Sequence, residues 1–285
     1  MQQFTNCLLP QQIVAGNIAA AKAKTEQPLL RMVLLGIFAG MFIACGASAS
    51  SVAMHAISNV GLARLVAGAV FPVGLMMILF VGGELFTGDC LMIMGCSHKA
   101  FSAIRMAQVL LIVFISNFLG AAGFAAMVTA STQFNFSSNL LGAFTIKVAI
   151  GKLNLSFGAA FVSGILCNIF VCAAVLMAAA AKDIAGKVFA VFFPILAFVV
   201  CGYEHCVANM YYIPAGIFAA KQEAYLTAAK NLYGYTAAQL DALSWGTFLV
   251  RNLIPVTLGN IVGGMVFVGL PLYLIHKDNL HSEKN

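Results

Sequence analysis

The sequence predicts an all-α membrane protein with six transmembrane helices in a 3+3 inverted repeat, in which the second and fifth helices are broken. Three observations lead to this fold class. Of the 285 residues, 62% are hydrophobic and only 8% are charged, a composition typical of integral membrane proteins. The chain contains several apolar runs of membrane-spanning length. Two of these runs are interrupted by glycine and glutamate at corresponding places in the two halves.

The first interrupted run extends from residue 62 to residue 96 and contains residues 82–89, GGELFTGD. A run of about 35 residues would form a helix roughly 52 Å long at about 1.5 Å per residue. A bilayer core is about 30 Å thick, so the run is too long for one span and too short for two spans with a turn. A helix broken at the glycines accounts for this length, and non-helical backbone at that depth must be buried in protein or face a cavity.

The second interrupted run extends from residue 184 to residue 220 and contains residues 202–209, GYEHCVAN. Aligning Glu84 with Glu204 also aligns Asp89 with Asn209. Interrupted apolar segments at corresponding places in two halves point to a transport site near the middle of a repeat-built membrane protein. The two interruptions are therefore the first candidates for a functional site.

The remaining elements follow in order along the chain. Residues 8–26 predict an interfacial helix that lies along the membrane, and polar connections are expected at 131–154 and 221–245. The other spans are expected at residues 29–55, 104–130, 155–181 and 245–274. The chain thus divides into an N-terminal amphipathic segment (1–28), a six-span channel domain (29–276) and a polar C-terminal tail (277–285), with repeat one at 29–130 and repeat two at 155–276.

The repeat pattern extends beyond the interrupted runs, because Asn117-x-x-Gly120 matches Asn260-x-x-Gly263. Three spans followed by three spans of the same pattern enter the membrane from opposite sides, which makes the repeat inverted. Nine of the fifteen Lys and Arg residues fall on the side of the N-terminus. This bias predicts a multi-pass protein of the cell inner (plasma) membrane with both termini in the cytoplasm.

Three carboxylates, Glu84, Asp89 and Glu204, lie within the membrane runs, where ionisable groups are costly and by default functional. Each carboxylate could instead be structural, capping a half-helix by accepting freed backbone N–H groups. Asn209 could do the same, as the counterpart of Asp89. Asn117 and Asn260 are expected to brace the broken helices by hydrogen bonds.

His205 aligns with Leu85 in the other half, so the symmetry of the scaffold does not require a histidine there. Although a lone histidine is commonly a packed core residue, its place beside a helix break favours a functional role, since imidazole titrates near physiological pH. Asn168 is expected to face the same passage. Lys152, at the outer mouth of the fourth span, is either a snorkelling interfacial lysine or a group that attracts anions.

Four motifs carry a resemblance to a known family: residues 83–87 (GELFT), 164–168 (GILCN), 202–210 (GYEHCVANM) and 252–260 (NLIPVTLGN). On these motifs the chain resembles the formate/nitrite transporter family over roughly residues 5–275. The resemblance implies a homopentamer of six-span protomers with an aquaporin-like inverted repeat and one pore in each protomer. It also implies a set of site residues: His205 as the central pore histidine, Thr87 as its partner, Asn168 in the same chamber, Lys152 in the vestibule, Phe71, Leu75 and Phe198 in one hydrophobic constriction, Phe86 and Val171 in the other, and Leu85 beside the chamber.

The resemblance further implies transport of small monovalent weak-acid anions: formate, with hydrosulfide or nitrite as further candidates. A bare anion should not cross two apolar constrictions. The resemblance accordingly implies that the anion takes up a proton before or at His205, either from the histidine or from bulk water, and crosses a constriction as the neutral acid.

Two alternatives belong to other functional classes. An aquaporin-type channel for small neutral solutes would require paired Asn-Pro-Ala sequences and an arginine filter, and neither Asp89 nor Asn209 is followed by Pro-Ala. A membrane enzyme or cofactor carrier would require histidine pairs or cysteine clusters, whereas the histidines and cysteines are scattered. We therefore expect no enzyme activity, no cofactor and no metal site. Basic residues form no block, so the expected partners are the anion, protons, the lipid bilayer and other copies of the chain, and not nucleic acid.

Overall fold

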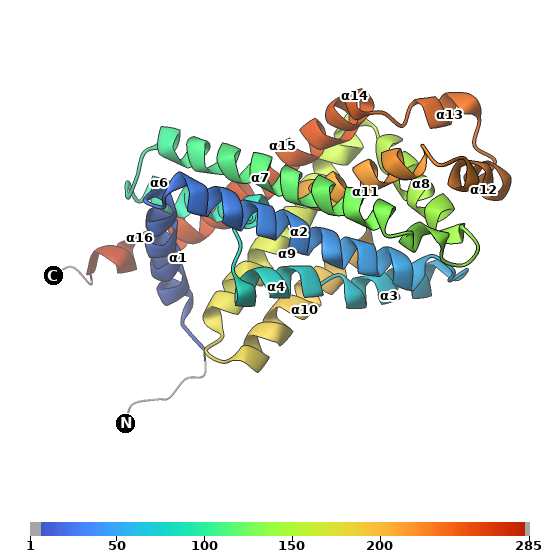
Figure 1. Ribbon diagram of the computed structural model, residues 1–285. Helices are drawn as coiled ribbons and strands as arrows, with labels where there is room; N and C mark the ends of the chain where they lie inside the picture. Colours follow the sequence, from blue (N-terminus) through green and yellow to red (C-terminus); the bar gives the residue numbers. More distant parts are fainter. Residues whose placement is uncertain (1–6, 283–285) are drawn as a thin grey trace.

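The computed structural model describes residues 7–282, so the expected N-terminal segment and C-terminal tail lie partly outside the described residues. Within residues 7–282 the chain is helical, apart from connecting segments and one isolated bridge between Cys7 and Ala181. Figure 1 shows long helices packed side by side, with α1 and α16 at one end of the bundle and α12 and α13 at the other.

Six helical stretches within the described chain are long and apolar enough to cross a membrane. The all-α fold class and the six expected spans are thereby confirmed. The protein is a multi-pass membrane protein. The six stretches are Leu29–Met54, Val60–Val81, Ala103–Ala130, Phe157–Ala180, Ile184–Cys201 and Trp245–Leu280.

The first half of the chain begins with α1, the helix expected to be interfacial, whose Pro10 occupies the first turn, where its missing N–H costs nothing. Its elements are α1 (Pro10–Thr25), α2 (Leu29–Met54), α3 (Val60–Val70), α4 (Val73–Val81), α5 (Phe86–Asp89), η1 (Cys90–Met92), α6 (Ile93–Ser97), α7 (Ala103–Ala130) and η2 (Gln133–Asn135).

The second half ends in a long helix that contains two π-helical segments, η3 and η4. Its elements are α8 (Leu140–Leu153), α9 (Phe157–Ala180), α10 (Ile184–Cys201), α11 (Cys206–Ala219), α12 (Glu223–Tyr233), α13 (Ala237–Asp241), α14 (Trp245–Thr247), η3 (Phe248–Leu253), α15 (Ile254–Gly264), η4 (Met265–Gly269) and α16 (Leu270–Ser282). Helix α16 thus continues into the region expected as a polar tail.

Helix α8 lies in the region expected as a polar connection. Its 14 residues are too few to span a bilayer, which is why the sequence pattern favoured a loop. Leu141, Ile146 and Ile150 are nevertheless buried, because α8 packs against α11 and α12. Burial of this apolar face holds the helix in place at one end of the bundle.

Two helix pairs, α2 with α7 and α9 with α15, pack closely along their lengths. Glycines allow this approach: a Cβ atom at Gly40 would collide with the carbonyl oxygen of Asn117, and one at Gly164 would lie 2.7 Å from the carbonyl oxygen of Val256. Small residues at such contacts are typical of membrane helices, where packing replaces the hydrophobic effect as the main attraction.

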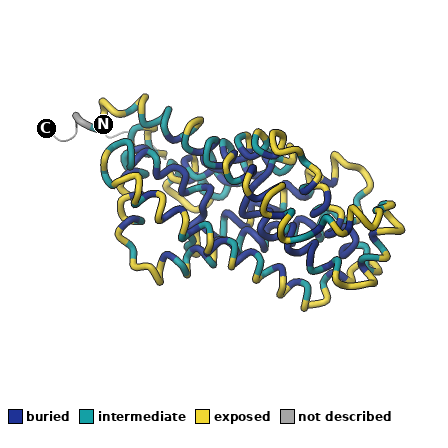
Figure 2. The backbone as a smooth tube through the Cα atoms, turned by 90° about the horizontal axis from the view of Figure 1, so that it is seen from above, coloured by how far each residue is buried: buried dark blue, intermediate teal, exposed yellow. Residues whose placement is uncertain are grey.

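Buried residues run through the centre of the bundle and exposed residues lie on its outside, as Figure 2 shows. Much of this outer surface is apolar; Ile104, Leu111 and Phe189, for example, are each more than half exposed. Such a surface would aggregate in water but matches the apolar interior of a lipid bilayer.

The glycine contacts between α9 and α15 generate a stability prediction. Replacing Gly164 by alanine should lower the free energy of unfolding by about 1–3 kcal/mol, because the added methyl group overpacks the contact. The measurement is the thermal unfolding midpoint in detergent. Gly158 lies in the same helix with no atom within 4 Å of an added Cβ, so Gly158→Ala should leave the midpoint unchanged or raise it. Equal midpoints for the two variants would contradict this account of the packing.

Candidate functional site

The backbone is non-helical at two places near the centre of the bundle. Helix α4 ends at Val81 and α5 begins at Phe86, while α10 ends at Cys201 and α11 begins at Cys206. Each preceding helix stops at a glycine with positive φ, 108° at Gly82 and 73° at Gly202, a conformation that only glycine adopts without strain. Residues 82–85 and 202–205 therefore carry backbone groups without helical partners.

One asparagine side chain forms hydrogen bonds with backbone groups of the first of these segments. The Oδ1 atom of Asn117 accepts a hydrogen bond from the backbone N–H of Phe86 at 3.0 Å. Its Nδ2 atom donates to the carbonyl oxygens of Glu84 at 2.9 Å and Gly36 at 2.8 Å. The side chain thereby joins α7, α2 and the start of α5, and it satisfies buried backbone groups on both sides of the interruption.

A second asparagine serves the other segment in the same way. The Oδ1 atom of Asn260 accepts from the N–H of Cys206 at 2.9 Å. Its Nδ2 atom donates to the carbonyl oxygens of Glu204 at 3.0 Å and Gly164 at 2.8 Å. Asn117 and Asn260 are both fully buried and make corresponding contacts in the two halves of the chain.

His205 lies between the two segments and is 2% exposed. Its Nδ1 atom accepts a hydrogen bond from the backbone N–H of Ala208 at 3.0 Å, capping α11. Its Nε2 atom lies 2.9 Å from Oγ1 of Thr87, the second residue of α5. Since Nδ1 accepts, a neutral ring carries its proton on Nε2 and donates it to the Thr87 oxygen. The hydroxyl proton of Thr87 is then free to point elsewhere.

Asn168 is buried behind this pair. Its Nδ2 atom donates to the backbone carbonyl oxygens of Thr87 at 3.1 Å and of Asn260 at 2.6 Å. The amide therefore positions Thr87 by holding its backbone, and Asn168 is not among the residues that line the two cavities described next within residues 7–282.

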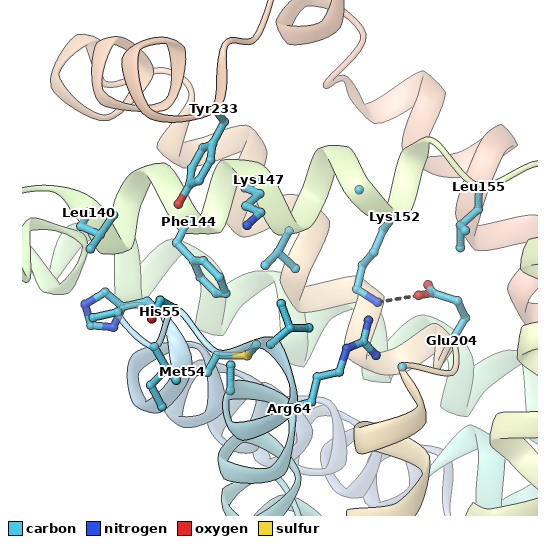
Figure 3. A pocket seen from close by; sticks show the side chains of 18 of the residues that line it. Met54, His55, Arg64, Leu140, Phe144, Lys147, Lys152, Leu155, Glu204 and Tyr233 are labelled. Atoms are coloured by element: carbon cyan, nitrogen blue, oxygen red, sulfur yellow. Dashed lines mark hydrogen bonds and ion pairs between the residues drawn. The ribbon is translucent and has the colours of Figure 1, made fainter.

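A cavity opens at the α8 end of the bundle, here called the α8-side cavity. Its wide part, about 580 Å³, is lined by basic side chains that include Arg64, Lys147 and Lys152. Figure 3 shows Arg64 of α3 and Lys152 of α8 pointing toward one another across it. Both residues also line a narrower part of about 250 Å³ that reaches Phe71, Phe198 and His205. His205 thus lies at the narrow inner end of a cavity whose wall carries basic side chains.

A second cavity of about 400 Å³, here called the α1-side cavity, lies under α1. Leu75, Leu85 and Asp89 line it together with Lys24 of α1. At the inner end of the α8-side cavity the rings of Phe71 and Phe198 meet edge to face, with centroids 5.6 Å apart, and Phe198 stacks on His205 at 6.1 Å.

The residues expected in the constrictions are distributed over the two cavities and the surrounding core. Leu75 lies with Leu85 in the α1-side cavity, whereas Phe71 and Phe198 line the α8-side cavity. Phe86 packs on Phe114 of α7, with ring centroids 4.9 Å apart. Val171 is buried, and neither Phe86 nor Val171 is among the lining residues of these two cavities within residues 7–282.

The carboxylate of Glu204 is buried, and both of its oxygens have polar partners. Its Oε1 atom pairs with Nζ of Lys152 at 2.9 Å. Its Oε2 atom accepts from Nδ2 of Asn209 at 2.6 Å and from Nδ2 of Asn252 at 3.3 Å. The Lys152 ammonium also lies 5.1 Å from the centre of the Tyr212 ring. Lys152 therefore neutralises a buried carboxylate, and its position is fixed by that contact. Lys147 lies instead over the rings of Phe144 and Tyr233.

The sequence reasoning missed Lys24, which makes the corresponding contact at the other end. Its ammonium contacts Oε2 of Glu84 at 2.5 Å and also pairs with Asp89. One signal could have found it, because Lys24 lies five residues before the start of α2 and Lys152 lies five residues before the start of α9. Arg64 was also missed, since a single exposed arginine in an amphipathic stretch gives no sign of facing a cavity.

No group of three or more His, Cys, Asp or Glu side chains in the described part of the chain is arranged to hold a metal ion. Six apolar helices, two opposed cavities and a buried polar centre between them define a multi-pass membrane protein of the channel or transporter class.

Comparison with known proteins identifies the family. A family model described as formate/nitrite transporter matches residues 11–274. The chain belongs to the formate/nitrite transporter family, which confirms the resemblance seen in its motifs.

Three relatives illustrate the match. The probable formate transporter of Methanothermobacter thermautotrophicus is 37% identical over 88% of this chain and 90% of its own. The formate channel FocA of Haemophilus influenzae is 36% identical over 90% of this chain and 89% of its own. A solved structure of a pentameric formate channel with formate bound is 33% identical, with a TM-score of 0.77 over 87% of this chain and 97% of its own. These relatives are named as channels or transporters, not enzymes, as expected.

The ion pair of Lys152 with Glu204 generates the second prediction. Lys152→Met should destabilise the protein by about 3–5 kcal/mol, because it leaves a buried carboxylate without its cation. The double variant Lys152→Met/Glu204→Gln should recover part of that loss, since the unpaired charge is then gone. The measurement is a double-mutant cycle of unfolding midpoints in detergent.

Lys147→Met is the matched control, because its ammonium lies 4.8 Å from the centre of the Tyr233 ring and no carboxylate among residues 7–282 is within ion-pair distance of it. Its cost should be about 1 kcal/mol or less. Equal costs for the two single variants would mean that the pair with Glu204 does not stabilise the fold.

Proposed function

We propose that the protein is a membrane channel for formate, and that it carries small monovalent weak-acid anions that take up a proton near His205. The observation that carries this proposal is the placement of one imidazole between two cavities that approach it from opposite ends. The solved relative with formate bound supports formate as the first substrate to test. Nitrite and hydrosulfide are proposed as further substrates because they are also small anions of weak acids.

The proposed architecture is the inverted repeat, with α4–α5 and α10–α11 as the two broken helices. The equivalent bonds of Asn117 and Asn260 and the equivalent spacing of Lys24 and Lys152 before α2 and α9 support it. Non-helical backbone inside a membrane protein is tolerated where protein buries it or a cavity lies beside it. Glu84 and Glu204 are buried in these segments, and a cavity lies beside each segment.

The α8-side cavity suits the capture of an anion. Lys152 and Glu204 neutralise each other, whereas Arg64 donates to the backbone carbonyl oxygen of Val200 and has no carboxylate within ion-pair distance among residues 7–282. The cavity therefore carries excess positive charge, which raises the local concentration of anions. This positive charge attracts the anion as far as Phe71 and Phe198, but it does not move the anion past these two rings.

Crossing the rings of Phe71 and Phe198 requires the loss of charge. Moving an ionised carboxylate into an apolar environment costs tens of kcal/mol in the limiting case, far more than the positive cavity returns. A formate that takes up a proton from the water of the cavity becomes neutral formic acid and can pass. In this proposal Nε2 of His205 holds Thr87, and the Thr87 hydroxyl proton is free to donate to an anion oxygen, with Asn168 keeping Thr87 in place.

The assembly and location are proposed on the same basis. The pentameric relative and the exposed apolar faces of the bundle support a homopentamer in the lipid bilayer. The Lys and Arg bias supports an inner (plasma) membrane protein with cytoplasmic termini. The α1-side cavity would then open to the cytoplasm and the α8-side cavity to the outside.

The third prediction concerns transport itself. Proteoliposomes containing the purified protein should carry formate faster than protein-free vesicles, and the rate should rise as pH falls, because more formate can cross as the acid. His205→Phe should lower this flux by roughly tenfold or more, since without the imidazole the Thr87 hydroxyl is no longer held where it donates to the anion, and loss of one such placed donor commonly costs at least that factor. The assay is stopped-flow flux of formate, nitrite and hydrosulfide across a range of pH.

His55→Phe is the control, because His55 lines the mouth of the same cavity far from the polar pair and should change the flux by less than about twofold. Unaltered flux and pH dependence in His205→Phe would remove the histidine from the mechanism. Water or urea flux without any formate flux in the unmodified protein would instead favour a neutral-solute channel.

A further inference from the structure

Lys24, Glu84 and Asp89, here called the acid–lysine cluster, place two carboxylates on one ammonium. The Lys24 nitrogen lies 2.5 Å from Oε2 of Glu84 and also contacts Oδ1 of Asp89. The side chains of Glu84 and Asp89 are 7% and 2% exposed. Gln27 adds one hydrogen bond to Oε1 of Glu84 at 3.1 Å. The cluster therefore holds one positive and two negative charges in a buried place.

The other end of the bundle holds the matched arrangement with one charge fewer. There Lys152 pairs with Glu204, and Asn209 stands where the alignment of the two halves places Asp89. The amide of Asn209 donates to Oε2 of Glu204 at 2.6 Å. That set is electrically neutral, whereas the acid–lysine cluster is not. The difference comes from a single side chain, Asp89.

The extra negative charge needs a counter-charge or a proton. Two buried carboxylates that share one cation cannot both ionise cheaply, and such pairs hold a proton between them. Lys24 cannot be the neutral partner: burial lowers its pKa, but the carboxylates of Asp89 and Glu84 outweigh this effect and hold the pKa of Lys24 above its usual value. The odd proton therefore belongs to a carboxyl group.

The structure indicates which oxygen carries it. Oε2 of Glu84 and Oδ2 of Asp89 are both buried without a hydrogen-bond partner. Oε2 of Glu84 is in ion-pair contact with Lys24, whereas Oδ2 of Asp89 has no such contact, and of the two carboxylates Asp89 is the one that lines the α1-side cavity. The other charged or titratable groups around it are Lys24 of α1, Glu84 of the preceding segment, Lys187 of α10, which lines the same cavity, and the thiols of Cys90 and Cys172. None of these supplies a second cation in ion-pair contact with Asp89 within residues 7–282.

We propose that the acid–lysine cluster is a proton-binding site in which Asp89 holds one exchangeable proton reached from the α1-side cavity. When the proton is bound the cluster is neutral; when Asp89 releases it to the cavity water, the cluster carries one net negative charge. A negative cluster in the cavity wall repels an arriving anion. On the proposed function, anion entry from the α1 side therefore depends on this proton, and entry from the α8 side does not.

The fourth prediction separates the two entrances. In vesicles of known orientation, formate entry from the α1 side should fall more steeply with rising pH than entry from the α8 side. Asp89→Asn copies the Asn209 arrangement and should make the two pH profiles coincide, with several-fold faster α1-side entry at high pH. Asp183→Asn is the matched control: it removes the same charge from an exposed residue whose cap on α10 asparagine also forms, and both profiles should stay as in the unmodified protein.

An infrared measurement tests the site without any transport. The protein at neutral pH should show a carboxylic-acid C=O band that Asp89→Asn abolishes and Asp183→Asn retains. If Asp89→Asn does not assemble, labelling aspartate with ¹³C at the side-chain carbonyl of the unmodified protein decides the question, because the other aspartates of residues 7–282 are exposed. A shift of the band on labelling supports the proposal.

The outcomes are distinguishable. Absence of the band, or a band unmoved by the label, overturns the proton-binding site, as does an unchanged difference between the two pH profiles in Asp89→Asn. A band that Asp89→Asn abolishes, in a protein that carries no formate, would leave the proton-binding site standing and overturn the proposed function alone.

Discussion

The structure depends on the pairing of backbone groups where helices stop inside the bundle. Each unpaired N–H or C=O in an apolar interior costs as much as a lost hydrogen bond or more. Asn117 and Asn260 meet that requirement, each with one accepted and two donated bonds. Only because these bonds exist can the chain leave helical geometry at Gly82 and Gly202 and hold Thr87 against His205.

The buried charges at the two ends of the bundle also lie at these interruptions of the helices. Glu84 and Glu204 lie in the non-helical segments, and each is compensated by a lysine from a helix at the edge of the bundle, α1 or α8. The ion pairs of these lysines connect α1 and α8 to the buried segments, so each cavity wall contains one such ion pair. The scaffold is alike at its two ends, whereas Asp89 and Arg64 make the electrostatics of the two cavities different.

Much of the fold could be predicted from composition and repeat alone, because a bilayer fixes the length of a span and tolerates few charges. The interruptions could also be located, since a glutamate beside glycine is costly in an unbroken apolar helix. The sequence pattern could not show which cavity each side chain of these segments lines in the folded bundle. Leu75 follows Phe71 by only four residues, yet Leu75 lines the α1-side cavity and Phe71 the α8-side cavity.

Contacts between distant segments were also beyond the sequence pattern. Lys24 looked like an interfacial residue of an amphipathic helix, because nothing local to residues 8–26 shows that α1 crosses the entrance of a cavity and reaches Asp89. Helix α8 was hidden for a related reason: its stability comes from burial against α11 and α12, and its own 14 residues give too short a signal.

Asn117 and Asn260 also restrict which single-nucleotide mutations the gene can accept at these two codons. Single-nucleotide changes of an asparagine codon yield Asp, His, Ile, Lys, Ser, Thr or Tyr, and none of these offers an acceptor on one branch and a pair of donors on the other in the same shape. Aspartate comes nearest in shape, yet it would set an oxygen against the carbonyls of Glu84 and Gly36 at the position of Asn117. Codons 117 and 260 are therefore expected to have no neutral one-step amino-acid replacement.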